Sequence, residues 1–66
     1  MNVMINGEPE VISTGTTVTA LLQAREVEER GTAVAVNGDV VLRRHWDTSR
    51  LREGDRVELL TVAQGG

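Results

Sequence analysis

The residues best suited to chemistry are the last four, Ala63-Gln64-Gly65-Gly66. Because glycine has no Cβ, a narrow channel of another protein can enclose this backbone, and no side chain obstructs attack on the final carboxylate. Four extended residues reach about 13 to 14 Å. The end of the chain therefore has the form of a substrate, although a frayed end or a cloning remnant fits the same residues. We expect Gly66 to react and Ala63, Gln64 and Gly65 to thread into a partner.

The residues that nucleophilic or metal-binding sites most often use are scarce in this sequence. The sequence has no cysteine, which excludes cysteine nucleophiles, disulfides and thiolate zinc sites. His45 is the only histidine, so it cannot build a His-rich metal site. We expect no catalytic residue and no metal site in this chain, and we expect His45 to be an exposed loop residue.

Length and charge narrow the class of protein. A chain of 66 residues suffices for one small domain with a thin core. Seven arginines against ten carboxylates give a net charge of -3, which argues against nucleic acid as a partner. No apolar run approaches the roughly 20 residues of a membrane span, and the first ten residues lack the pattern of a signal peptide. These features predict no membrane association and a cytoplasmic protein.

The first half of the chain predicts a hairpin and a helix. Residues 1–5 alternate in hydrophobicity, and Asn6-Gly7 is typical of a type I′ turn, so a second strand is expected near residues 10–13. Pro9 indicates that this strand lies at an edge. Thr17 is the expected N-cap of a helix of about two to three turns that ends before Gly31.

The second half predicts three more strands. Residues 32–36 alternate, Asn37-Gly38 repeats the turn signal, and residues 39–42 complete a second hairpin. An irregular connection over residues 43–52 precedes a final strand over residues 56–62. The predicted order of elements is therefore ββαβββ.

One helix must cover one face of the sheet, and the last strand can lie parallel to the first through a right-handed crossover. The sequence thus predicts an α+β fold of the β-grasp, or ubiquitin-like, kind, with a mixed sheet of about five strands. We expect residues 1–62 to form this domain and residues 63–66 to form a flexible tail. The expected core consists of Val3, Ile5, Val18, Leu21, Leu22, Val34, Val36, Val57 and Leu59.

Strand alternation also predicts an exposed surface. The sheet face opposite the helix should carry outward-pointing apolar residues from the first, third and last strands. Such a surface, next to the tail, favours docking of a partner protein. The residues expected in it are Met4, Ala35, Leu60 and Val62.

Trp46 is the only aromatic residue and lies in the arginine-containing connection. Two readings are open: an interface hot spot, because Trp and Arg are enriched there, or a plug that completes a core without Phe or Tyr. We favour the plug.

Several segments resemble one known family. The run Val34-Ala35-Val36-Asn37-Gly38-Asp39-Val40-Val41, then Arg43 and Trp46, then Leu51-Arg52-Glu53-Gly54-Asp55-Arg56-Val57-Glu58 and the final Gly65-Gly66 are similar to the thiamine-biosynthesis sulfur carrier family (ThiS). The opening Ile5-Asn6-Gly7-Glu8 is also similar, so the resemblance covers nearly the whole chain. Leu42 departs from the pattern, as does Gln64 in the threading segment.

The resemblance implies a function and partners. In this family an E1-like adenylyltransferase of the ThiF type activates the terminal glycine, here Gly66, with ATP and Mg. A sulfur donor protein then converts the acyl adenylate to a thiocarboxylate, which delivers sulfur to a thiazole synthase of the ThiG type. The carrier itself is not an enzyme and binds no cofactor. The chain has no thiol and no lysine amine that could capture the activated end, although we take both absences as an accident of composition.

Other functions remain open on the sequence. A carrier like the small subunit of molybdopterin synthase has the same fold and end, and a ubiquitin-like modifier would join Gly66 to lysines of other proteins. A β-grasp interaction module, of the kind found in RNA-binding regulatory domains, is a further alternative, but the acidic charge and the Gly-Gly end weigh against it.

Overall fold

Among residues 1–61, which the computed structural model describes, the chain forms five strands, one α-helix and one short 3-10 helix. The expected tail and Val62, at the expected end of the last strand, lie outside the described residues. The elements are β1 (Asn2–Ile5), β2 (Glu8–Val11), α1 (Val18–Ala24), β3 (Thr32–Val36), β4 (Asp39–Val40), η1 (Arg43–His45) and β5 (Arg56–Thr61).

Both predicted Asn-Gly turns are formed. Asn6 and Gly7 have φ angles of 51° and 83°, and Asn37 and Gly38 have 52° and 87°, as a type I′ turn requires at its two central residues. The two-residue turn places Glu8 directly opposite Ile5, so β2 begins two residues earlier than predicted. The second hairpin is shorter than predicted. Its second strand, β4, ends at Val40 rather than at Leu42, and Leu42 is the N-cap residue of η1.

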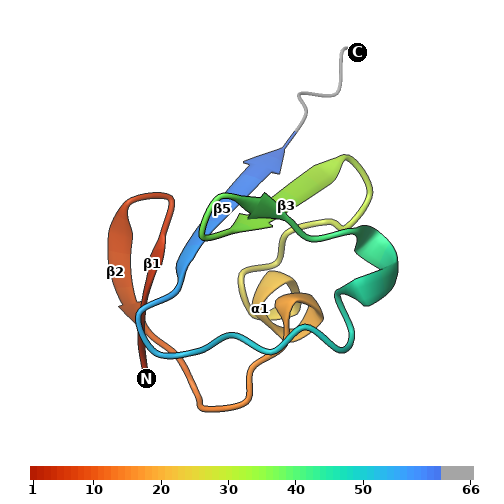
Figure 1. The fold of residues 1–66 in the computed structure, drawn as a ribbon. Helices are drawn as coiled ribbons and strands as arrows, with labels where there is room; N and C mark the ends of the chain where they lie inside the picture. Colours follow the sequence, from red (N-terminus) through yellow and green to blue (C-terminus); the bar gives the residue numbers. More distant parts are fainter. Residues whose placement is uncertain (62–66) are drawn as a thin grey trace.

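The strands form one sheet in the order β2-β1-β5-β3-β4. Figure 1 labels β2, β1, β5 and β3 of this sheet. β5 lies parallel to β1 and antiparallel to β3, so the strand latest in the sequence occupies the centre. Pro9 lies in the edge strand β2, as predicted. The single helix and the central parallel pair make this a β-grasp fold, and the predicted fold class is confirmed.

Helix α1 has a defined signal at each end. The hydroxyl of Thr17 accepts a hydrogen bond from the backbone N–H of Ala20 at 3.1 Å, which confirms the predicted N-cap. At the other end Glu26 adopts a positive φ of 57°, and the N–H of Val27 donates to the carbonyl of Leu22 at 2.9 Å. This is a Schellman motif, and Val27 packs against the core beneath it.

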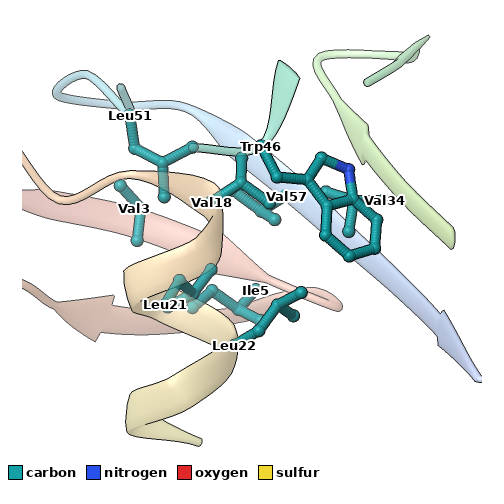
Figure 2. Close-up of a cluster of buried hydrophobic side chains, with 9 residues drawn as sticks. All are labelled: Val3, Ile5, Val18, Leu21, Leu22, Val34, Trp46, Leu51 and Val57. Carbon is teal, nitrogen blue, oxygen red and sulfur yellow. The ribbon is translucent and has the colours of Figure 1, made fainter. Parts of the chain in front are cut away.

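The core lies between α1 and one face of the sheet, as Figure 2 shows. Seven of the nine expected core residues are buried, whereas Val36 and Leu59 are only half-buried at its margin. Trp46 and Leu51 from the irregular connection take part instead. The buried residues are Val3, Ile5, Val18, Leu21, Leu22, Val34, Trp46, Leu51 and Val57.

Trp46 completes this core. Its side chain is 2% exposed, and its indole Nε1–H donates a hydrogen bond to the carbonyl of Val41 at 2.8 Å. Burial of both the ring and its polar atom confirms that Trp46 is a structural plug.

Candidate functional site

The face of the sheet opposite α1 carries a group of apolar side chains near the end of β5. Ala33 of β3 lies opposite Leu60 of β5. Ala35 of β3 lies opposite Val40 of β4, the strand on the other side of β3. Leu60 and Val40 are 70% and 71% exposed, which is high for large aliphatic side chains. These residues, with Glu58, surround a shallow hollow of about 210 Å³. We call Ala33, Ala35, Val40 and Leu60 the open-face patch.

The structure brings together only part of the surface that the sequence predicted. Leu60 and Ala35 both belong to the open-face patch. Met4 lies on the same face and is 36% exposed, but it pairs with Arg56, four residues from Leu60 along β5. At about 3.3 Å per residue this separates them by about 13 Å, so Met4 is not next to Leu60.

The other predicted site residues lie outside the described residues: Val62 of the surface, and Ala63, Gln64, Gly65 and Gly66 of the tail. Their roles therefore stay predictions. The sequence analysis also missed Val40, because strand alternation gives the side of each residue but not the register of the short edge strand β4. His45 is exposed in η1, as expected.

Two asparagine side chains hold β5 in place. Asn6 accepts a hydrogen bond from the N–H of Leu59 at 2.8 Å and donates to the carbonyl of Leu59 at 3.3 Å. Asn37 accepts from the N–H of Arg56 at 2.9 Å and donates to the carboxylate of Asp55 at 3.0 Å. The sequence marked both asparagines as turn residues, but the contacts with β5 require the tertiary register.

The turn before β5 is fastened to β1 by Glu53. Its carboxylate accepts hydrogen bonds from the backbone N–H of Asn2 at 2.8 Å and from the side-chain amide of Asn2 at 3.3 Å. Both hydrogen bonds favour the charged form of the Glu53 carboxyl group, and the bond from the backbone N–H has the larger effect. The positive charge of the N-terminal ammonium acts in the same direction. Together they lower the pKa of Glu53 below its ordinary value of 4.5.

Glu53→Gln is expected to lower the melting temperature at pH 7. A carboxyl group whose pKa is lowered by folding adds stability above its unfolded pKa, and this contribution is lost as pH falls through the folded pKa. The difference from wild type should therefore shrink below pH 4.5. Thermal melts between pH 7 and pH 2 check this, with Glu28→Gln as a control in an exposed loop. An equal difference at every pH would contradict a role for the charge.

Within residues 1–61, no group of three or more His, Cys, Asp or Glu side chains is placed to hold a metal ion. The same residues contain no helix that is both long and apolar enough to span a membrane. The candidate site therefore consists of the open-face patch, the end of β5 that carries Leu60, and the sequence that continues from it to Gly66.

Comparison with known proteins identifies similar chains. A model described as the ThiS family matches residues 3–66. The sulfur carrier protein ThiS of Escherichia coli (strain K12) is 30% identical over 66 residues, which cover 100% of each chain. The sulfur carrier protein ThiS of Thermus thermophilus is 38% identical over 64 residues, or 97% of this chain and 98% of that protein. The crystal structure of the thiamine biosynthesis protein (ThiS) from Geobacter metallireducens superposes with a TM-score of 0.85 at 35% identity, covering 100% of each chain.

Proposed function

Because the chain belongs to the ThiS family, we propose that it is a sulfur carrier of thiamine biosynthesis and that the carboxylate of Gly66 carries the sulfur. One observation carries the proposal: the family match extends through Gly65 and Gly66, the residues on which the chemistry depends. Two relatives that match over nearly their whole length are named sulfur carrier proteins. In this role the chain is a protein co-substrate, and its partner enzymes supply the catalytic groups.

The proposed chemistry has two steps. In the active site of a ThiF-type enzyme, a carboxylate oxygen of Gly66 attacks the α-phosphorus of ATP, and pyrophosphate leaves. A sulfide equivalent from the sulfur donor protein then attacks the acyl carbon, and the bond to AMP breaks with its electron pair on AMP. The product is a thiocarboxylate, an exposed sulfur nucleophile for a ThiG-type thiazole synthase. Mg on ATP, held by the activating enzyme, offsets the phosphate charge.

The open-face patch supplies the docking surface in this proposal. Leu60 directly precedes Thr61, the last residue of β5, and five residues lead from there to Gly66. A partner that covers the patch therefore also lies close to Thr61, from which the sequence continues to Gly66. Apolar surfaces of this kind are typical of protein interaction sites.

Intact-mass spectrometry tests the function. The carrier is incubated with a ThiF-type enzyme, ATP, Mg and a sulfur donor, and its mass is compared with that of a reaction without donor. Replacement of one oxygen by sulfur at Gly66 is the expected result. High-mass conjugates would instead indicate a ubiquitin-like modifier, and an unchanged mass would contradict both functions. If a molybdopterin-type partner accepts sulfur from the thiocarboxylate and a ThiG-type partner does not, the carrier serves molybdopterin synthesis instead of thiamine synthesis.

Leu60→Asp is expected to weaken docking without unfolding the protein. Leu60 is 70% exposed, so aspartate meets solvent in the free protein, whereas in the complex it buries a charge in an apolar contact. We expect KM for the carrier in adenylation to rise about tenfold, which corresponds to about 1.4 kcal/mol of binding energy.

Val11→Asp is the matched control for this variant. Val11 is 79% exposed and lies on the edge strand β2, two strands from β5, so the same change of charge occurs away from the patch. Equal rates for Leu60→Asp and wild type at subsaturating carrier would remove the open-face patch from the docking surface.

A further inference from the structure

The end of β5 has a strand partner on one side only among the described residues. On the β3 side, pairing continues to Thr61, which lies opposite Thr32. On the β1 side, the last strand pair is Ile5 with Val57, and the backbone N–H of Asn6 donates to the carbonyl of Val57 at 2.9 Å. The chain then turns away into β2.

The side chain of Asn6 takes the place of the missing strand residue. The side-chain carboxamide of asparagine carries an NH2 donor and a C=O acceptor, so it can make both kinds of hydrogen bond that a peptide group makes. Asn6 directs both at the same residue of β5: its Oδ1 accepts from the N–H of Leu59 and its Nδ2 donates to the carbonyl. A residue 53 positions away in the sequence thereby extends the β1–β5 ladder by one step.

We propose that Asn6 is a positioning residue for the adenylation of Gly66, an inference that rests on the proposed function. Gly66 follows Leu59 by seven residues, and Leu60 of the open-face patch is the next residue after Leu59. Docking of the patch brings the carrier to the enzyme, but the reaction also requires the carboxylate to be aligned with ATP, and a misaligned reacting group costs rate even when the carrier is bound. By holding Leu59 on the side that has no strand partner, Asn6 fixes the backbone of β5 next to Leu60, the strand from which the sequence continues to the reacting carboxylate.

Asn37 provides a matched control within the same strand. It is the first central residue of the other type I′ turn, with nearly the same φ, and its side chain also makes two hydrogen bonds. These bonds hold Asp55 and Arg56, at the start of β5 rather than at its end. Glycine tolerates the positive φ at either position, so Asn6→Gly and Asn37→Gly remove the side-chain bonds and keep both turns.

The experiment measures ATP–pyrophosphate exchange with a ThiF-type enzyme over a range of carrier concentrations. Asn6→Gly is expected to lower kcat about tenfold with little change in KM, because misplacement of a reacting group costs rate even where binding is intact. Asn37→Gly is expected to keep the wild-type kcat and to lower the melting temperature as much as Asn6→Gly does. Asn6→Asp should recover part of kcat, because a carboxylate still accepts from the N–H of Leu59 but cannot donate to its carbonyl.

Amide hydrogen exchange at Leu59 is measured in parallel and should be faster in Asn6→Gly than in wild type. A wild-type kcat for Asn6→Gly would overturn the proposal, as would equal losses of kcat in both glycine variants or a rise in KM alone. If the wild-type carrier supports no exchange of pyrophosphate, the proposed function fails. In that case, hydrogen exchange at the amide of Leu59 still tests the hydrogen bonds of Asn6. Unchanged hydrogen exchange in Asn6→Gly would also overturn the positioning role, and faster hydrogen exchange would support the hold of Asn6 on Leu59.

Discussion

Deleting Gly66 is expected to abolish ATP–pyrophosphate exchange with the activating enzyme. The deletion moves the terminal carboxylate back by one residue, about 3.5 Å in an extended chain. That distance is as large as the whole separation between reacting atoms in a productive complex, about 3 to 3.5 Å. In the proposed mechanism the carboxylate would then fall short of the α-phosphorus of ATP, and docking of the folded domain is not expected to compensate for this distance.

Gly66→Ala is expected to reduce the same exchange at least about 100-fold, the usual scale for a misplaced reacting group. The added Cβ lies next to the reacting carboxylate, and we expect the narrow channel of the proposed partner to accept the bare backbone of glycine but not this Cβ. Gln23→Ala, on the exposed surface of α1, is the control and should match wild type. A wild-type exchange rate for either Gly66 variant, with melting temperatures unchanged, would contradict the carrier role.

Trp46→Ala is expected to remove a large part of the stability of the protein. Truncation of a buried Trp costs about 3 to 5 kcal/mol, and a chain of this size has a total stability of about 3 to 10 kcal/mol. The substitution also removes the indole donor from the carbonyl of Val41. Urea denaturation should be followed by far-UV circular dichroism, because Trp46 is the only aromatic residue and its loss removes the fluorescence signal.

Two further variants define the cause of this loss. Trp46→Phe keeps much of the apolar volume but leaves the Val41 carbonyl without its donor, so a smaller loss of about 1 to 3 kcal/mol is expected. His45→Ala changes an exposed neighbour and should stay within about 0.5 kcal/mol of wild type. Equal midpoints for Trp46→Ala and His45→Ala would contradict the role of Trp46 as a plug.

Local sequence signals predicted most of the fold. Each Asn-Gly pair specifies a turn whose two central residues need positive φ, and the alternating residues around it specify which face is buried. A last strand parallel to the first satisfies the handedness rule, and β5 has this orientation in the structure. The core was harder to predict, because alternation gives the side of a residue but not how far the short helix α1 covers it. Val36 and Leu59 therefore lie at the margin, and Leu51, in a segment without periodicity, was missed.

The sequence predicts only those residues of the candidate site whose position follows from alternation along a single strand. Leu60 and Ala35 follow from alternation along β5 and β3. The separation of Met4 from Leu60 depends on the register between β1 and β5, and the sequence pattern does not contain this register. The clamp that Asn6 forms on Leu59 depends on the same register, so the sequence reveals only the turn to which Asn6 belongs.

The central place of β5 also determines when the protein can fold. Its neighbours β1 and β3 come earlier in the sequence, and they share no ladder with each other. A nascent chain on the ribosome that still lacks β5 has two separate hairpins, and isolated hairpins are marginally stable in water. Folding must therefore follow translation of β5, because this strand joins the two hairpins into one sheet. An interrupted translation product would never display the patch, so partner enzymes would not be occupied by fragments that cannot carry sulfur.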